Sequence, residues 1–363
     1  MNQIFDLYTD YIIGSFQQIT ATGLSKVIDN ALSHDKITRM LSSIESDSKA
    51  LWLNVKSIVR ENETEEGCLI FDDTLVEKPY TDENEIICWH YDHCSGKNIK
   101  GINLLTTFYY SQKNESEMPI KVPIGFDIIT KYPHSSELET KKVKRKSLVT
   151  KNELMRQQIS VAINNNAKFS YILADSWFSS SENMKFIHAQ NKYFIFDLKN
   201  NRLASTGDRN EAKWLNISNL DLQDNVPIKV WLKDVEISIL LIKQVFKNKD
   251  GSIGERYLAS NNLNLTGDEF GTTYKKRWSI EEFHKSVKQN SCIAKSPTGT
   301  VKTQKAHIFA SIISYIKLER YKLSTKLNHF ALKNKIYIKA MKVAFAELLN
   351  IKQQYGINED YSL

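Results

Sequence analysis

The sequence has little of what marks a disulfide scaffold or a membrane protein. Its four cysteines, Cys68, Cys88, Cys94 and Cys292, show no paired spacing, and a chain of 363 residues needs no covalent cross-links to be stable. No apolar run approaches the roughly 20 residues that span a bilayer, and no basic region followed by an apolar stretch opens the chain. We therefore expect a cytoplasmic protein in a reducing compartment, without a membrane anchor.

The composition is that of a folded globular protein, with 41% hydrophobic and 25% charged residues. The length indicates two or three domains. The net charge of +7 is a weak sign of a polyanionic partner, but its distribution is informative. Between Tyr274 and Leu349 there are sixteen Lys and Arg and only four Asp and Glu, so the carboxyl-terminal region is the basic one.

Residues 1–62 are predicted to be helical. Apolar residues fall at helical spacing in two groups, which are Leu24, Val27, Ile28 and Leu32, and then Ile37, Met40 and Leu41. Between the groups, Ser33 or Asp35 can cap a new helix. Two short helices joined so closely resemble a helix-turn-helix, in which Lys36, Thr38 and Arg39 would face a DNA groove. The alternative is a helical hairpin that packs on the main domain.

From residue 68 the pattern changes to extended segments, CLIFDDT, EIICWHYD, NIKGINLLTTFYY and KVPIGFDIITKY, which we predict to be consecutive antiparallel strands. A basic linker over 141–151 precedes an amphipathic helix over 152–164, the strand FSYILADSWF, another helix and the strand KYFIFDL. This order is that of a ribonuclease H-like α/β domain, a mixed sheet with helices on its faces.

The strands PIKVWLK, VEISILLIKQVF and ERYLAS follow without a helical period between them, which predicts an inserted β subdomain. The predicted organisation is a helical amino-terminal region (1–62), the first part of the catalytic domain (63–199), the inserted β subdomain (200–262), the last part of the catalytic domain (263–300) and a basic helical carboxyl-terminal region (301–363).

The segment TTYKKRWSIEEFHKSVKQN places four polar residues, Tyr274, Arg277, Glu281 and Lys288, at offsets 0, 3, 7 and 14. On one helix these residues share a face, and the opposite side carries Ile280, Phe283 and Val287 for packing against the sheet. One helix would then present a carboxylate between cations. The alternative is a solvated face with pairs of the Arg277–Glu281 type.

Two more carboxylates follow apolar strands, Asp72 in LIFDDT and Asp175 in YILADSWF. Taken singly, either could be a turn or cap residue. Together with Glu281 they meet the need of phosphodiester cleavage for hard oxygen ligands that hold two Mg²⁺ ions. Arg277 and Lys288 would counter the phosphate charge.

At these motifs, DDT, LADSWFSS and the Tyr-x2-Arg-x3-Glu-x6-Lys pattern in YKKRWSIEEFHKSVK, the chain resembles the DDE transposases of bacterial insertion sequences that carry the YREK signature. The resemblance runs from about Cys68 to Gln289. It implies that Asp72, Asp175 and Glu281 are the catalytic residues and metal ligands, for two Mg²⁺ ions with Mn²⁺ as a substitute. It also implies that Tyr274, Arg277 and Lys288 contact the DNA backbone.

The first ligand has a neighbour of the same type, since Asp73 adjoins Asp72. Adjacent residues on a strand face opposite sides, so only one of the two can point at the metals. We favour Asp72, because the family's motif places its Thr two residues after the acid.

The gap of 106 residues from Asp175 to Glu281 is as expected where this family inserts a β subdomain. In relatives the insertion helps to hold a flipped base during hairpin formation, with a Trp as the stacking surface. Trp214, Trp231 and Trp278 are the candidates, and the alternative for each is a core aromatic.

The resemblance implies a transposase that cleaves DNA at insertion-sequence ends and transfers strands into target DNA. Its partners would be double-stranded DNA, as terminal inverted repeats and target, and a second copy of the chain in a synaptic dimer. The protein would then associate with the nucleoid. The alternatives are a regulator or inactive remnant that binds element ends without cutting, and a stand-alone ribonuclease H-like nuclease.

Two further patterns resemble functional motifs, but we interpret both as ordinary surface structure. Cys88, His90, His93 and Cys94 fit no common zinc spacing, and a turn at His93, Ser95 and Gly96 is expected instead. The run KKVKRK resembles a nuclear signal, but we interpret it as a solvated loop near the DNA.

Overall fold

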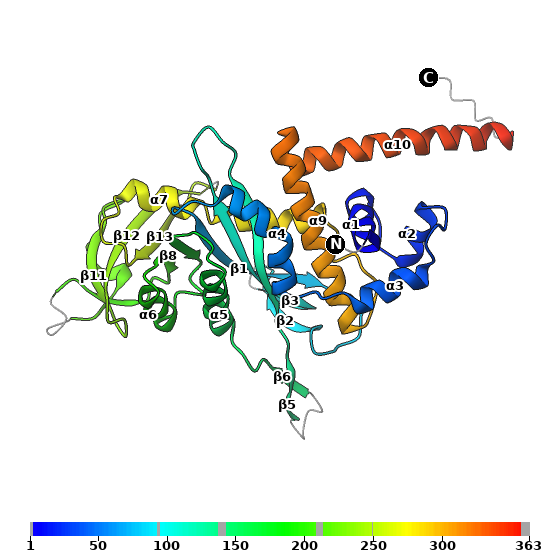
Figure 1. The fold of residues 1–363 in the computed structure, drawn as a ribbon. Coiled ribbons are helices and arrows are strands. Elements are labelled where there is room, and N and C mark those ends of the chain that lie inside the picture. Colours follow the sequence, from blue (N-terminus) through cyan, green and yellow to red (C-terminus); the bar gives the residue numbers. More distant parts are fainter. Residues whose placement is uncertain (1–2, 93–94, 137–142, 208–212, 249, 357–363) are drawn as a thin grey trace. The chain divides into compact units, whose positions relative to one another are not determined.

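The computed structural model describes residues 3–92, 95–136, 143–207, 213–248 and 250–356. The chain divides into two compact units. Unit 1 comprises Met1–Ile44, Lys285–Thr298 and Lys302–Leu363, and unit 2 comprises Glu45–His284 and Gly299–Val301. Each unit is described by itself, and Figure 1 gives the order of their elements along the chain.

Unit 2 is built on a large mixed sheet with helices, which confirms the predicted α/β class. Its first strands are β1 (Cys68–Glu77), β2 (Cys88–Asp92), β3 (Lys97–Ser111), β4 (Ile120–Ile128), β7 (Tyr171–Ala174) and β8 (Tyr193–Leu198). β3 pairs antiparallel with β1, β2 and β4, whereas β7 runs parallel to both β1 and β8. The expected strands are all present.

Two sequence predictions about these strands need correction. β2 does not lie between β1 and β3, because the long β3 pairs with β1 directly and takes β2 at its own first residues. The basic linker over 141–151, of which the structure describes residues from 143 on, is also not all loop, since its β6 (Val143–Lys146) pairs with β5 (Tyr132–Ser136). Neither pairing leaves a local sequence signal, because both depend on partners brought together by the rest of the fold.

The predicted strands of residues 200–262 extend the same sheet. They are β9 (Leu203–Ser205), β10 (Leu215–Asn216), β11 (Ile228–Leu232), β12 (Ser238–Lys247) and β13 (Ile253–Ser260). β13 pairs antiparallel with β8, and the order continues through β12, β11 and β9 to β10. The sheet therefore has eleven strands in the described part of the chain.

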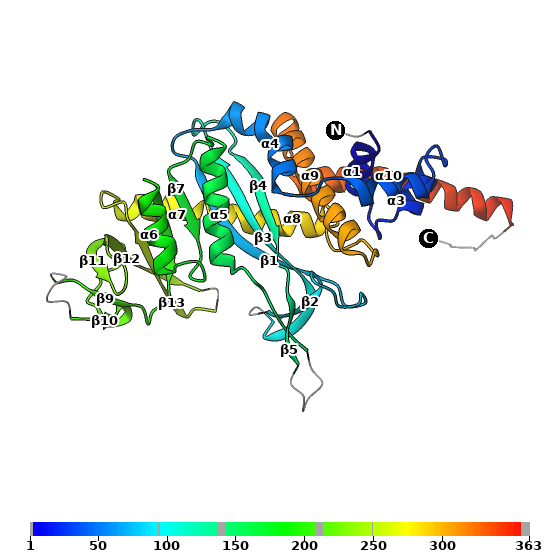
Figure 2. The same cartoon turned by 60° about the horizontal axis from the view of Figure 1, so that its bottom comes forward.

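Helices cover both faces of this sheet. They are α4 (Ser48–Asn62), α5 (Lys151–Asn164), α6 (Ser181–Ala189), α7 (Gly267–Lys275) and the first part of α8 (Trp278–Gln289). In Figure 2, α5 and α6 lie in front of the sheet and the yellow α7 and α8 lie behind it. Thr150 and Thr266 begin α5 and α7 with reciprocal capping boxes, each with a Glu three residues later. Phe283 of α8 packs on Phe108 of β3, with the ring centroids 5.2 Å apart, as the apolar side of the helix predicted.

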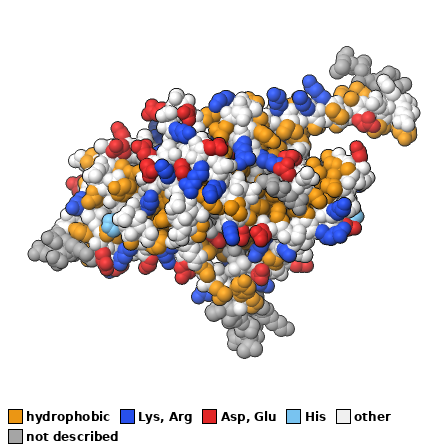
Figure 3. All heavy atoms as spheres, viewed as in Figure 1, with side chains coloured by type: hydrophobic (Ala, Val, Ile, Leu, Met, Phe, Trp, Pro, Cys, Tyr) orange, Lys and Arg blue, Asp and Glu red, His pale blue; other side chains and the backbone are white. Residues whose placement is uncertain are grey.

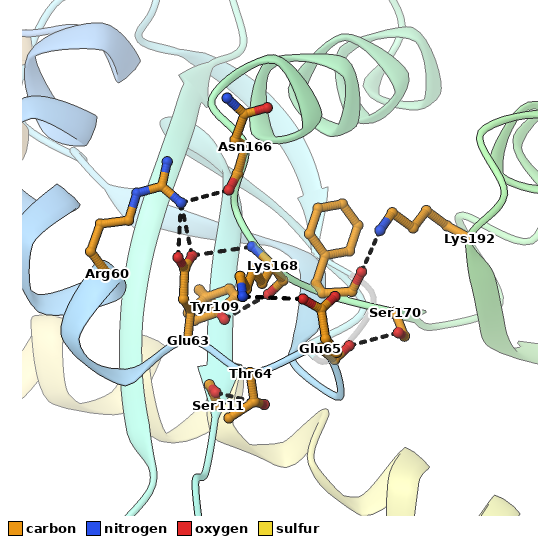
Figure 4. Close-up of polar contacts among 11 residues, drawn as sticks. Arg60, Glu63, Thr64, Glu65, Tyr109, Ser111, Asn166, Lys168, Ser170 and Lys192 are labelled. Carbon is orange, nitrogen blue, oxygen red and sulfur yellow. Dashed lines mark hydrogen bonds and ion pairs between the residues drawn. The ribbon is translucent and has the colours of Figure 1, made fainter.

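The beginnings of β1 and β7 are tied together by polar contacts around the loop after α4 (Figure 4). Arg60 pairs with Glu63 at 2.9 Å and donates to the carbonyl oxygens of Asn165 and Asn166, which end α5. Glu63 accepts a hydrogen bond from the backbone N–H of Lys168, 3.2 Å away. The network therefore fixes the positions at which β1 and β7 begin relative to each other.

Unit 1 is helical. It contains α1 (Gln3–Gly14), α2 (Ala21–Val27), α3 (His34–Ser43), the end of α8, most of α9 (Val301–Thr325) and α10 (His329–Gln354). α1 packs on α9, where Tyr8 shares a hydrogen bond of 3.0 Å with His307, and Phe5 stacks on Phe309. The buried Lys333 ammonium donates to the carbonyl oxygens of Ile13 and Ser15, which end α1.

Ser33 caps α3 as predicted, since its side chain accepts from the backbone N–H of Lys36. α2 is shorter than the apolar spacing indicated, because it ends at Val27, before Ile28 and Leu32. Asp29 and Asn30 follow at positive φ, a left-handed conformation that cannot continue a helix. No helix of the described residues is long and apolar enough to cross a membrane.

Replacing Arg60 should destabilise unit 2. Arg60→Ala leaves Glu63, whose side chain is only 9% exposed, without its cation, so the free energy of unfolding should fall by about 1–3 kcal/mol. Urea denaturation measures this change. Lys185→Ala is the matched control, because it removes only an exposed ion pair with Glu236 and should cost less than about 0.5 kcal/mol. Equal losses for the two variants would contradict the anchoring role.

Candidate active site

Three aspartates follow residues that are paired across three neighbouring parallel strands. Phe71 of β1 is in register with Ala174 of β7, and Ala174 is in register with Phe196 of β8. The next residues are Asp72, Asp175 and Asp197. Because parallel strands lie about 4.8 Å apart, the register brings these three carboxylates to one region of the sheet.

Asp72 and Asp73 point to opposite sides of β1, as strand geometry requires. Asp73 is engaged by both of its oxygens, which contact the Lys151 ammonium and the Asn103 side-chain amide, each at 2.8 Å. Asp72 instead faces α8 and the turn before it, since its Oδ2 lies 3.8 Å from Arg277 in the turn and 3.9 Å from His284 on α8. Of the two neighbours, Asp72 is therefore the one placed with the predicted carboxylate helix.

That helix is not continuous, which corrects the sequence prediction of one helix over the Tyr-Arg-Glu-Lys pattern. Tyr274 lies in α7, Glu281 lies in α8, and Arg277 lies in the turn between them. In this turn the backbone makes bonds across three residues, from Arg277 N to Tyr274 O and from Ile280 N to Arg277 O. The tighter turn breaks the helical phase on which the shared face of all four residues was predicted.

The break gives Tyr274 a buried position. Only 4% of its surface is exposed, and its hydroxyl donates at 3.4 Å to the carbonyl oxygen of Ala174, the residue before Asp175. The Arg256 guanidinium lies over its ring at 5.0 Å. Tyr274 therefore holds α7 against the end of β7, and its expected contact with the DNA backbone stays a prediction.

Arg277 lies among the carboxylates. Its Nη1 is 3.3 Å from Glu281 and 3.8 Å from Asp72, and the side chain is 17% exposed. Burial lowers the pKa of Arg277, but the neighbouring Tyr274, Asp72 and Glu281 outweigh that effect and raise it. The guanidinium is thus a fixed positive charge between the two acids.

A group of possible metal ligands forms beside it. One ligand atom each from Asp72, Glu281 and His284 lies within 4.8 Å of the others. His284 was missed by the sequence analysis, although its spacing of three residues after Glu281 places it on the same side of a helix. The set contains two of the three predicted ligands.

Asp175, the third predicted ligand, is not part of that group. Its Oδ1 accepts a hydrogen bond of 3.0 Å from the backbone N–H of Trp177, as in a turn that an aspartate caps. Its charge is nevertheless near enough to Asp72 to raise the pKa of that carboxyl. The structure therefore brings Asp72 and Glu281 together and leaves Asp175 beside them, turned toward its own loop.

The electrostatics fit a divalent cation. Burial raises the pKa of Asp72 to about 8, with a further contribution from the charges of Glu281 and Asp175. Burial also raises the pKa of Asp175, which the Trp177 N–H and Arg277 partly oppose. Crowded carboxylates that resist ionisation are stabilised when a cation neutralises them, and carboxylate oxygens are the ligands that Mg²⁺ prefers.

Asp197 was also missed. Burial raises its pKa to about 6, an effect that Arg256 opposes and Asp175 increases. It lines a cavity of about 520 Å³ together with Ser176 and Arg256. The signal was present in the sequence, because FIFD has the same form as LIFD and YILAD, an apolar strand that ends in an aspartate.

The remaining predicted DNA-binding residues are spread over the chain. Trp278 is 63% exposed at the start of α8. Lys36 and Arg39 are exposed on α3, and Lys288 is exposed on the part of α8 that belongs to unit 1. Of the other base-stacking candidates, Trp214 is 36% exposed just before β10, and Trp231 is half-buried on β11.

The structure describes two of the four residues at which the sequence analysis expected no zinc site. Cys88 and His90 are buried on β2, and the imidazole Nδ1 of His90 lies 3.1 Å from the Lys131 ammonium. His93 and Cys94 lie outside the described residues.

Comparison with known proteins places most of the chain in one family. Residues 63–317 match the family model described as "Transposase DDE domain". No curated protein matches the chain. The match covers more than two thirds of the sequence and contains every acid of the site, from Asp72 to Glu281. The chain therefore belongs to the family of transposases with a DDE domain.

Proposed function

We propose that the protein catalyses Mg²⁺-dependent cleavage of DNA at insertion-sequence ends and transfer of the freed strands into target DNA. The observation that carries this proposal is the placement of Asp72 and Asp175 on register-paired strands, with Glu281 of α8 beside Asp72. This arrangement gathers hard oxygen ligands in a half-buried region, which phosphodiester chemistry requires. The assignment to the YREK subgroup is part of the proposal.

Asp72, Asp175 and Glu281 would hold two Mg²⁺ ions, or Mn²⁺ as a substitute. The ions supply an activated water and stabilise the leaving oxygen. Asp175 would contribute by releasing the Trp177 N–H, and His284 would offer a further donor next to Asp72. Metal ions would neutralise Asp72 and Glu281, the partners of Arg277. The guanidinium would then be available to a DNA phosphate, to which it can donate two parallel hydrogen bonds.

The sheet order supports the proposed ribonuclease H-like core. The series β3, β1, β7 and β8 begins with an antiparallel pair and continues with two parallel pairs, and α5 and α6 make the crossovers. Under this proposal residues 63–199 and 263–300 form the catalytic domain, and the strands of 200–262 are its β insertion. Residues 1–62 and 301–363 are proposed to bind DNA and to assemble the complex.

We propose that the protein forms a synaptic homodimer on double-stranded DNA and that α10 makes the contact between the two copies. This helix exposes apolar residues at alternating spacings of three and four, which include Tyr337, Met341, Leu348, Ile351 and Tyr355. In Figure 3, both hydrophobic (orange) and basic (blue) side chains are visible along α10. An apolar seam of this spacing is typical of helices that pair with another helix, while the lysines suit a DNA backbone.

Cleavage of linear DNA that carries the repeats flanking the gene tests the enzyme. The wild type should cut at the element ends only with Mg²⁺, whereas Asp175→Ala and Glu281→Gln should bind the DNA and lose cleavage by at least about a thousandfold. Gel analysis of the products also detects a hairpin. Tight binding by a folded wild type without any cutting would favour a regulator or inactive remnant. Cutting without strand transfer would favour a stand-alone nuclease.

The metal-free stability of two neighbouring variants should change in opposite directions. Because the pKa of Asp72 is raised from 3.8 to about 8, the folded protein binds its proton more tightly and loses stability as the pH rises between those values. Asp72→Asn should therefore raise the melting temperature in EDTA at pH 8, and Asp73→Asn should lower it by removing the partner of Lys151. Mg²⁺ should stabilise the wild type and Asp73→Asn but not Asp72→Asn. The reverse pattern in thermal melts would make Asp73 the ligand.

Lys288 is expected to contact a phosphate. Lys288→Ala should weaken DNA binding about equally for all sequences and reduce the slope of log K against log salt by about one. Fluorescence anisotropy over a salt series measures the slope. Lys56→Ala, an exposed lysine on α4, is the control that should leave it unchanged. An unchanged slope for Lys288→Ala would remove this residue from the DNA interface.

A further inference from the structure

Two cavities of unit 2 meet at the residues that follow Asp175. One, of about 500 Å³, lies beside the start of α5, and the other, of about 390 Å³, lies beside the start of α6. Both are lined by Ser176, Trp177 and Lys199. The two cavities therefore adjoin each other, and we call them together the Trp177 groove. Ser176, which lines both, directly follows the proposed ligand Asp175 in the sequence.

The Trp177 groove is basic. Lys131 and Lys151 line its first part, Arg202 and Lys233 line its second part, and Lys199 lines both. Among the lining residues that the structure describes, Asp234 is the one acid. Such an excess of cations along a groove favours a chain of phosphates as ligand over an acidic side chain or a neutral molecule.

Trp177 stands at the junction of the two cavities with half of its surface exposed, at 50%. Its backbone N–H is held by the Asp175 carboxylate, and the Lys151 ammonium lies 5.0 Å from its ring centroid. Lys151 is itself fixed by Asp73 at 2.8 Å. The indole is thus a large aromatic surface on a short turn that is anchored at both sides.

We propose that the Trp177 groove binds unpaired nucleotides of the DNA strand next to the cut, with a base stacked on Trp177 and the adjoining phosphates on the lysines. An aromatic ring reads no base edge, so it accepts any base whose face is open, and a paired base inside a duplex does not offer that face. The groove would therefore hold the strand after local unpairing. This inference rests on the proposed function, since the cut defines which nucleotides reach the groove.

The test compares binding of two probes without metal, a duplex of about 20 base pairs with blunt ends and the same duplex with a single-stranded extension of about five nucleotides. The wild type should bind the extended probe about tenfold more tightly. Trp177→Ala should lose that preference and keep its affinity for the blunt duplex, while Trp177→Phe should retain most of it. Trp89→Ala removes an indole of similar exposure, 54%, that lines neither cavity, and should behave as the wild type.

Equal preference for the extended probe in the wild type and Trp177→Ala would overturn the proposal. If Trp177→Ala fails to fold, as judged by its thermal melt, Lys199→Ala decides. It should reduce the salt slope for the extended probe by about one and leave the slope for the blunt duplex unchanged. Because no cleavage is measured, a chain that cuts no DNA but shows this preference would refute the proposed function alone.

Discussion

Asp72, Asp175 and Asp197 follow residues that are paired across three parallel strands, so their charges must share one largely buried region of the protein. Burial, and to a smaller extent the charges of Glu281 and Asp175, raises the pKa of Asp72 to about 8. Arg277 is the cation that stands among these acids, 3.3 Å from Glu281 and 3.8 Å from Asp72. The contacts around these acids hold an arrangement that is unfavourable by itself, as is common at functional sites.

The anchoring begins at the opposite ends of the strands. Contacts of Arg60 and Glu63 fix where β1 and β7 start, and the register then determines which residues of the two strands lie side by side. At the far end Tyr274 hydrogen-bonds to Ala174 and sets α7 against β7. A shift of one residue in either strand would turn its aspartate to the other face. The same alternation separates Asp72, which faces α8, from Asp73, which pairs with Lys151.

Most of this architecture could be predicted from the sequence, because strands such as CLIFDDT and YILA and the helix capped by Thr150 carry strong local patterns. Asp197 and His284 also carried such patterns. The break between α7 and α8 could not be predicted, since the segment KKRWS contains neither Pro nor Gly and the turn depends on where Tyr274 and Arg277 are held. The position of β2 at the edge of β3 likewise depends on long-range pairing that periodicity does not encode.

Asp175 lies between the acidic site around Asp72 and the Trp177 groove. Its carboxylate accepts a hydrogen bond from the backbone N–H of Trp177, so the same oxygen cannot also point at a cation beside Asp72. On the other side Asp73 fixes Lys151, which lies over the Trp177 ring. Turning Asp175 toward a metal would release the Trp177 turn, and a base stacked on the indole would restrain it again. Under the proposals above, a metal that recruits Asp175 and a base that stacks on Trp177 would therefore act on one short turn, so the two binding events would be coupled through this carboxylate.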